Sequence, residues 1–372
     1  MKLNTVRGLA EAEGVLTRID PLDLSKLPES VIQRTYQTFG NGTSPQESVA
    51  RILSEVQNEG DPAVFRYASL LDDANLQCLE VAPRDFASAR SSLSPQLIAS
   101  LELAAQRVQD FHEATLPQNW IDYEKGLGEL IRPIERVGLY APGGTAAYPS
   151  TVLMTAIPAR VAGVSEIVLA TPKRGDAPLN PAVLVAAEIA GVDVVYQVGG
   201  VQAIGALAYG TQTIPKVDKI CGPGNIFVAY AKKLVQGQVD IDGIFGPTET
   251  IVIADESARP DFCAADLIAQ AEHDPLATAI LVTNSNALVE AIESELDVQM
   301  KNLDRGKTAT EALRKQGTVV ILDSIDEAIH LANKIAPEHL CLMVADPWKW
   351  VGSVKHAGGL FLGAFSPEVM GD

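Results

Sequence analysis

Short β-branched runs alternate with helical patterns through most of the chain, and this alternation restricts the fold more than any other feature of the sequence. The runs are apolar at consecutive positions, and Gly and Pro interrupt the stretches between them. Such strands are buried on both faces, and crossovers of this length join parallel neighbours. The pattern therefore predicts doubly wound α/β units. The runs span 137–140, 166–170, 192–198 and 217–221, and then 250–253, 279–282, 319–322, 340–344 and 360–362.

Two series of runs in 372 residues indicate two domains, because single hydrophobic cores rarely grow past about 250 residues. A passage rich in Gly and Asp separates the series, so we expect the domains to meet near residue 247. Upstream, residues 44–59 and 94–114 carry apolar stripes at helical spacing. We expect two Rossmann-like domains and a helical N-terminal arm, with the arm at 1–30, one domain from 31–139 with 248–372, and the other from 140–247.

Charge and cysteine content exclude several classes of protein. The 29 Lys and Arg against 47 Asp and Glu give a net charge of −18, which disfavours nucleic acid and anionic membranes as partners. The four cysteines lie far apart without a C-x-x-C pair, so we expect neither a disulfide framework nor a structural zinc knot. No apolar run resembles a signal-peptide core or a membrane span. We therefore expect a cytoplasmic protein.

A helix that begins at Pro260 and stops before Pro275 carries two candidate metal ligands. Its end holds Gln270 and His273, which are three residues apart and therefore neighbours on the helix surface. An imidazole together with an oxygen donor is a ligand set of catalytic zinc sites. A solvated helix end with two polar residues explains the same spacing, and the residues alone do not decide between these interpretations.

Glu338 and His339 follow a proline at the boundary between a helix and a strand. A carboxylate and an imidazole can both accept protons near neutral pH. Adjacent residues on an extended chain point in opposite directions, so the two would serve different protons or different steps. An ordinary polar loop is the alternative. The remaining histidines outside these motifs are expected at the surface or its boundary: His112, His330 and His356.

Glycine-rich turns occur at three strand ends, over 138–150, 198–210 and 221–225. Such turns can bring backbone N–H groups and a helix N-terminus close to a ligand phosphate. None of them contains G-x-G-x-x-G, and the glycines fit tight turns equally well. The choice between NAD and its phosphate form stays open, because no ribose-binding acidic residue can be identified.

Seven motifs in order carry a resemblance to one family: VGLYAPGG, GGVQAIGALAYGT, VDKICGPGN, GPTE, QAEH, APEHL and the terminal SPEVMGD. With these motifs the chain resembles the histidinol dehydrogenases, from its early helices to its last residue. The resemblance implies an architecture like that of the aldehyde dehydrogenases. It also implies NAD-dependent oxidation of L-histidinol to L-histidine in two steps through bound L-histidinaldehyde, the last step of histidine biosynthesis, on a homodimer with one zinc ion per site.

The resemblance also assigns roles to residues. His339 matches the base that takes the hydroxyl proton. Glu338 matches the residue that activates the water adding to the aldehyde, and we expect it to be a buried carboxylate tuned to that role. The matched zinc ligands are Gln270, His273 and Asp372, the cofactor contacts are Tyr140, Gln202 and Asn225, and the substrate contacts are Thr248, Gln270, His273, His339 and Asp372.

Members of the family continue past the Gly-Asp motif into a C-terminal segment with a further zinc ligand, whereas this sequence stops at Asp372. We therefore expect the chain as given to bind zinc weakly and to turn over little. Two alternatives stay open. An aldehyde dehydrogenase-like enzyme needs a cysteine nucleophile, for which Cys221 and Cys341 are the candidates. A non-catalytic relic would bind NAD or another ligand without turnover.

Overall fold

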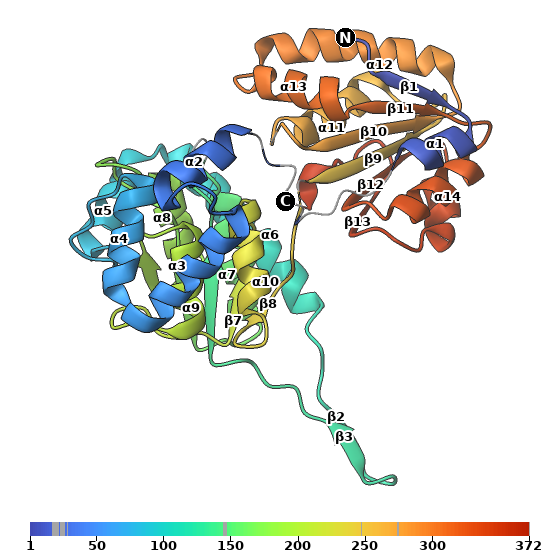
Figure 1. Ribbon diagram of the computed structural model, residues 1–372. Coiled ribbons are helices and arrows are strands. Elements are labelled where there is room, and N and C mark those ends of the chain that lie inside the picture. The colour runs from blue at the N-terminus through green and yellow to red at the C-terminus, as the bar shows by residue number, and fades with distance from the viewer. Residues whose placement is uncertain are drawn as a thin grey trace. The chain divides into compact units, whose positions relative to one another are not determined.

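The computed structural model describes residues 1–16, 22, 27, 29–143, 147–246, 248–273 and 275–371. The chain forms two compact units, each built on one parallel sheet (Figure 1). The first unit contains Met1–Asp20 and Gly246–Asp372, and the second contains Pro21–Phe245. Within the described ranges, no helix combines the length and the apolar composition needed to cross a bilayer.

The first unit has a six-stranded parallel sheet in the order β1-β11-β10-β9-β12-β13. Its elements are β1 (Asn4–Arg7), α1 (Leu9–Val15), β9 (Glu249–Ala254), α11 (Pro260–Ala271), β10 (Thr278–Thr283), α12 (Asn286–Gln299), η2 (Met300–Asn302), α13 (Gly306–Gln316), β11 (Thr318–Ile321), α14 (Ile325–Ile335), β12 (His339–Met343), η3 (Pro347–Ser353), β13 (Gly359–Leu362) and η4 (Glu368–Met370). Helices α11, α12 and α13 cover one face, and α1 and α14 cover the other (Figure 1). In β9, Val252 packs into the first layer and Ile251 into the second, so both faces are buried as predicted.

The second unit has a five-stranded parallel sheet in the order β6-β5-β4-β7-β8. Helices α3, α4, α9 and α10 cover one face, and α5 to α8 cover the other. A two-stranded antiparallel hairpin extends away from the body of this unit (Figure 1). Its elements are α2 (Glu29–Phe39), α3 (Pro45–Glu59), α4 (Asp61–Asp72), α5 (Pro83–Ser92), α6 (Pro95–Ala114), β2 (Trp120–Asp122), β3 (Leu127–Glu129), β4 (Arg136–Tyr140), α7 (Pro149–Val161), β5 (Glu166–Ala170), α8 (Pro181–Ile189), β6 (Val194–Tyr196), α9 (Gly200–Tyr209), β7 (Lys219–Cys221), α10 (Ile226–Val235) and β8 (Asp240–Ile241).

The predicted parallel α/β architecture is confirmed, and every predicted apolar run forms a strand. The sequence did not predict β1, β8 and the hairpin. Strand β1 lies at the edge of its sheet and buries only Val6, so it lacks a consecutive apolar run. The hairpin strands expose nearly all their side chains, which removes the pattern that a buried strand leaves in a sequence.

The structure divides the chain differently from the predicted domains. Residues 29–139 belong to the second unit, because the apolar stripe of α3 packs against α9 rather than on the first unit. Gly205 allows this close approach, since a Cβ at that position would lie 3.2 Å from Leu53 and from Val56. At the N-terminus, β1 pairs in parallel with β11. The first residues are therefore part of the first unit and not a separate helical arm.

Candidate active site

Three predicted site residues converge at the amino edge of the six-stranded sheet. Thr248 precedes β9 and Glu338 precedes β12, and these two strands are neighbours in the sheet. Helix α11 connects two parallel strands, β9 and β10, so it must run back toward the amino edge. Its last turn brings Gln270 to that edge. The topology thus gathers residues that are far apart in the sequence.

A line of hydrogen bonds joins these three side chains. Gln270 donates through Nε2 to Thr248 Oγ1 over 2.6 Å, and the Thr248 hydroxyl donates to Glu338 Oε2 over 2.6 Å. The backbone N–H of Glu249 also donates to Glu338 Oε2, at 3.3 Å. Glu338 itself is exposed. The prediction of a buried carboxylate at this position is therefore wrong, because the residue lies just before the strand and its side chain stays at the sheet edge.

Gln270 offers a donor atom that suits a metal ion. Its side chain is fully buried, and its Oε1 has no hydrogen-bond partner among the residues that the structure describes. A buried polar atom without a partner costs on the order of 1–3 kcal/mol. The C-terminal end of α11, where carbonyl groups carry partial negative charge, also favours a cation. The amide oxygen of Gln270 therefore fits a metal-ligand role.

The other two predicted ligands are less well defined. His273 lies two residues beyond the end of α11 and is exposed, while its backbone N–H donates to the carbonyl of Gln270 over 3.3 Å. Asp372 lies outside the described residues. Within the part of the chain that is described, no group of three His, Cys, Asp or Glu side chains is arranged to bind a metal. The support for a metal ion at this site thus depends on the amide oxygen of Gln270.

His339, the first residue of β12, is enclosed by side chains from two other elements. It is 6% exposed, and its ring meets Phe361 of β13 edge to face with centroids 5.7 Å apart. Its Nδ1 lies 3.7 Å from Oε2 of Glu368, a fully buried residue in η4. The imidazole therefore sits against a carboxylate inside the first unit.

Asp266 and Glu368 are buried acidic residues that sequence reasoning missed. Asp266 lies one turn before Gln270 on α11, and its carboxylate accepts hydrogen bonds from the thiol of Cys341 and from the backbone N–H of Glu368. Burial raises the pKa of Asp266 to about 6. An acidic residue inside the apolar stripe of α11 was the available signal for Asp266. Glu368 carried no comparable signal, because a single acid in a short loop does not reveal its burial.

Main-chain contacts hold the segment that carries Glu338. Ala336 ends α14 in the left-handed region with φ 55°, an uncommon conformation for a residue with a side chain. The N–H of Gly359 donates to the carbonyl of Glu338 over 2.7 Å. A Cβ on Gly358 would lie only 2.7 Å from that same carbonyl oxygen, so glycine is needed there. The position of Glu338 is thus set by its backbone.

The predicted cofactor residues lie in the second unit, at the carboxyl edge of its sheet. Strand order reverses between β4 and β7, and doubly wound sheets bind ligands at such a reversal. Tyr140 ends β4, Gln202 lies in the first turn of α9, and Asn225 precedes α10. Each predicted residue therefore belongs to an element that begins or ends at this edge.

The three predicted cofactor residues make different contacts. The Tyr140 hydroxyl accepts the backbone N–H of Gly200 over 3.1 Å, and burial raises the pKa of Tyr140 to about 12. Gln202 donates through Nε2 to Asp72 over 3.2 Å, and its buried Oε1 has no hydrogen-bond partner within the described residues. The Asn225 side chain accepts two N–H groups of the first turn of α10 and caps that helix. The structure thus gives Asn225 a helix-capping role of its own.

An ion pair between the buried Lys232 and the partly exposed Asp242 holds the turn after β7. Gly222 has φ 115°, and a Cβ there would lie 2.1 Å from the carbonyl oxygen of Tyr140, so only glycine fits. Its N–H donates to Asp242 over 2.6 Å, and its carbonyl accepts from Lys232 over 3.0 Å. Lys232, which is 2% exposed, also pairs with Asp242. The backbone of this turn therefore requires glycine at position 222, as the tight-turn interpretation of the glycine-rich segments predicts.

Neither candidate cysteine is activated as a nucleophile. Burial, followed by the charge of Asp242, raises the pKa of Cys221 to about 11. Burial also raises the pKa of the Cys341 thiol, and Asp266 and Glu368 add to that effect. A catalytic cysteine requires the opposite shift. These environments disfavour the chemistry of a cysteine-dependent aldehyde dehydrogenase.

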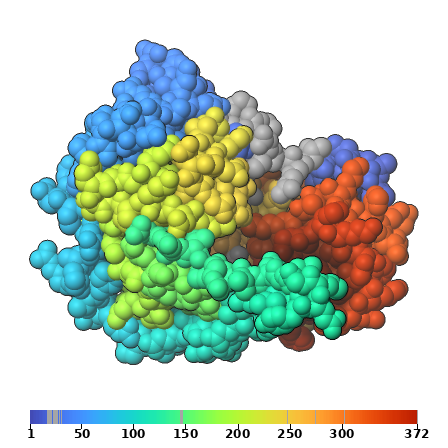
Figure 2. Space-filling model, turned by 90° about the horizontal axis from the view of Figure 1, so that it is seen from below, coloured from blue at the N-terminus to red at the C-terminus, as the bar shows by residue number. Residues whose placement is uncertain are grey.

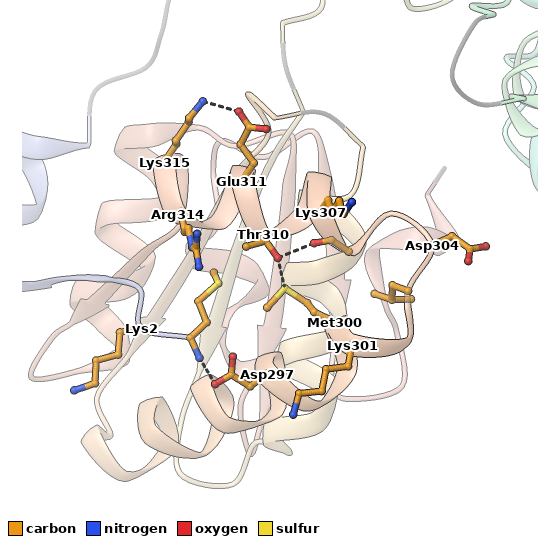
Figure 3. Close-up of a pocket in the computed structure, with 13 residues that line it drawn as sticks. Lys2, Asp297, Met300, Lys301, Asp304, Lys307, Thr310, Glu311, Arg314 and Lys315 are labelled. Atoms are coloured by element: carbon orange, nitrogen blue, oxygen red, sulfur yellow. Dashed lines mark hydrogen bonds and ion pairs between the residues drawn. The ribbon is translucent and has the colours of Figure 1, made fainter.

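A cleft of about 1020 Å³ lies elsewhere in the first unit, between the N-terminal residues, η2 and α13 (Figure 3). None of the predicted site residues lines it. Lys2, Lys301 and Lys307 point in different directions around it (Figure 3). Their charges are not gathered on one ligand position.

The fold and the geometry define the class of the protein, an α/β enzyme with acid–base side chains at one sheet edge and glycine-rich turns at another. The family model for histidinol dehydrogenase matches residues 38–372. The histidinol dehydrogenase of Clostridium acetobutylicum is 47% identical over 329 residues, which cover 88% of this chain and 76% of that protein. That of Dehalococcoides mccartyi is 46% identical over 371 residues, which cover 100% and 84%.

A solved structure agrees. The crystal structure of histidinol dehydrogenase from Elizabethkingia anophelis matches with a TM-score of 0.88 at 34% identity, over 99% of this chain and 82% of that chain. The chain therefore belongs to the histidinol dehydrogenase family and is an oxidoreductase.

Proposed function

We propose that the protein oxidises L-histidinol to L-histidine in two NAD-linked steps through bound L-histidinaldehyde, as the last step of histidine biosynthesis. Membership of the family supports the substrate. The observation that carries the proposal is the line of hydrogen bonds from Gln270 through Thr248 to Glu338. It joins a metal-ligand candidate to a proton acceptor at the sheet edge where His339 begins its strand.

One zinc ion would be held by Gln270, His273 and Asp372. Bound there, zinc would orient the substrate through its amino and imidazole nitrogens. The partnerless Oε1 of Gln270 supports this assignment. Thr248 accepts a hydrogen bond from Gln270 and donates one to Glu338, so it would hold the metal ligand and the carboxylate at a fixed distance from each other. Thr248 would also contact the substrate.

NAD would be contacted by Tyr140, Gln202 and Asn225 and would supply the hydride acceptor. The position of these residues at the strand-order reversal supports the assignment. So does the second partnerless buried amide oxygen, on Gln202. The hydroxyl of Tyr140 orders the turn that carries Gln202 by accepting the N–H of Gly200.

The two proton transfers are divided between adjacent residues. In the first step His339 accepts the hydroxyl proton of the alcohol at a ring nitrogen while the carbon gives up hydride, which yields the aldehyde. In the second step Glu338 accepts a proton from the water that adds to the aldehyde carbon. The resulting hydrate anion gives up a second hydride, which a second NAD would accept, and the carboxylic acid so formed loses its proton to solvent to become the carboxylate. Thr248 and the N–H of Glu249 hold Glu338 for this role.

We also propose that the protein is a cytoplasmic homodimer. The hairpin supports the dimer, because an isolated two-stranded ribbon is at best marginally stable in water. Trp120, Ile121 and Leu127 on its strands are about half exposed, and Tyr123 at its turn is 87% exposed. The hairpin side chains are in full view in Figure 2, in teal to green. Four free thiols support a reducing compartment.

The direct test incubates the purified chain with L-histidinol and NAD and follows the reduced cofactor. We expect two NADH per histidine formed, with the activity lost on chelation and restored by zinc. The metal content of the same sample tests the proposed zinc site. Ligand binding without turnover would indicate a relic, and loss of activity on Cys221→Ala or Cys341→Ala would indicate aldehyde dehydrogenase chemistry.

A further inference from the structure

A buried carboxylate stands against the residue that we assign as the base. We propose that Glu368 is a positioning residue for His339, whose Nδ1 it holds so that Nε2 is the nitrogen presented to the substrate hydroxyl. This inference rests on the proposed function, because it concerns the first proton transfer of that reaction. Glu368 itself touches His339 and not the reacting atoms.

The geometry supports a charge contact between the two side chains. Glu368 Oε2 lies 3.7 Å from His339 Nδ1, a distance in the range of ion pairs and longer than a hydrogen bond. Hydrogen bonds of catalytic groups are often long before substrate binds and tighten afterwards. Glu368 is fully buried and His339 nearly so. Charges attract more strongly in such surroundings than in water.

Glu368 is held in place by the helix that carries the metal-ligand candidate. The carboxylate of Asp266 on α11 accepts the backbone N–H of Glu368, which fixes the start of η4. At the other end of this turn, the N–H of Gly371 donates to the carbonyl of Glu368 over 2.8 Å. Gln270 lies one turn further along α11. Helix α11 therefore positions both Glu368, the carboxylate beside His339, and Gln270, the proposed zinc ligand.

Charged and titratable groups near His339 come from several of the elements packed around it. They include Glu368 of η4, Asp266 of α11, Cys341 two residues along β12, and the neighbouring Glu338. Burial keeps Cys341 a neutral thiol by raising its pKa. A carboxylate beside an imidazole stabilises the imidazolium that forms when the ring takes a proton. The carboxylate of Glu368 lies 3.7 Å from Nδ1 of His339.

The test compares Glu368→Gln with Glu368→Asp in the full chain. For Glu368→Gln we expect kcat to fall about 30-fold to 100-fold with little change in KM for histidinol, the range for partners that orient a reacting group. Glu368→Asp keeps the carboxylate and its charge, so its loss of kcat should be smaller, again with little change in KM.

Glu293→Gln is the matched control, since this carboxylate of the same unit accepts the backbone N–H of Leu3 over 2.9 Å. It should leave kcat and KM unchanged. Wild-type kcat in Glu368→Gln would overturn the proposal. Equal losses of kcat in both Glu368 variants would show a merely structural role and would also overturn it.

Nitrogen-15 NMR of the wild-type histidines gives a readout that needs neither turnover nor a folded Glu368→Gln. The sequence has five histidines, so comparison with His339→Asn assigns the His339 signals. We expect neutral His339 to carry its proton on Nδ1. The Nε2–H tautomer in an active enzyme would refute this inference alone. The Nδ1–H tautomer in a folded chain that does not oxidise histidinol would refute the proposed function and leave the Glu368 contact standing.

Discussion

The two units use opposite edges of the same kind of sheet. In the first unit, the polar cluster lies where parallel strands begin and where α11 ends. In the second, the glycine-rich turns lie where strands end and where α9 and α10 begin. Helix C-termini favour cations and helix N-termini favour anions. Under the proposed function, one edge would take the metal-bound substrate and the other the anionic cofactor.

Two buried glutamines, one in each unit, allow the two sheet edges to be compared residue by residue. Gln270 and Gln202 are both fully buried, and each donates its amide N–H to a neighbour, Thr248 or Asp72. The Oε1 of each has no hydrogen-bond partner in the described parts of the chain. We expect one of these oxygens to serve the metal and the other the cofactor. Substitutions at the edge with Gln270 should therefore change metal binding and the rate of the chemical steps. Substitutions at the edge with Gln202 should change the affinity for the cofactor.

The largest effect is expected from His339→Asn. Loss of the base should lower kcat about 1,000-fold, within the range for general acid–base groups. Affinity for NAD, measured by calorimetry, should stay near the wild-type value because the proposed cofactor residues lie in the other unit. His330→Asn is the control, since His330 is exposed and pairs with Glu13. Near-normal kcat in His339→Asn would contradict the assignment of the base.

Gln270→Leu should remove bound zinc and lower activity about 100-fold. Leucine is close to glutamine in size but has no oxygen to bind the ion, and loss of a ligand weakens a site of few ligands strongly. Metal content by mass spectrometry checks the first effect and steady-state kinetics the second. Full zinc content in this variant would rule out Gln270 as a ligand.

Gln202→Leu makes the same change at the other edge. We expect KM for NAD to rise about tenfold, on the scale of one lost hydrogen bond, with zinc content and KM for histidinol unchanged. A loss of bound zinc in Gln202→Leu would contradict the assignment of metal binding to one sheet edge and cofactor binding to the other. An equal rise of KM for NAD in Gln202→Leu and Gln270→Leu would contradict it too.

The smallest effect on activity is expected for Asp266→Asn, whose main consequence is for stability. Burial raises the pKa of Asp266 to about 6 in the folded chain, above its ordinary value of 3.8. The folded state therefore binds this proton more tightly, and the resulting stabilisation is lost as pH rises from about 4 to 6. The change amounts to about 3 kcal/mol.

In Asp266→Asn this pH dependence should disappear. Denaturant titrations at pH 4 and pH 8 measure it, and Asp304→Asn, at an exposed site, is the control. An unchanged difference between the two pH values would mean that Asp266 is not the titrating group.

Much of the fold was predictable because buried parallel strands leave consecutive apolar residues in a sequence. The strands that escaped prediction, β1 and the hairpin, lack that pattern. The packing of α3 was not predictable for a different reason. An apolar stripe indicates that a helix is buried but not against which partner, and here the choice depended on the close approach that Gly205 permits.

The sequence by itself determined the alternation of strands and helices, the residue types of the candidate site, and, through its ordered motifs, the family. Only the tertiary structure decided that Glu338 is exposed, that Asp266 and Glu368 are buried, and that Gln270 reaches Glu338 through Thr248. The physical reason is that burial and hydrogen bonding depend on what surrounds a side chain. A sequence states local preferences, whereas those surroundings come from segments nearly a hundred residues apart.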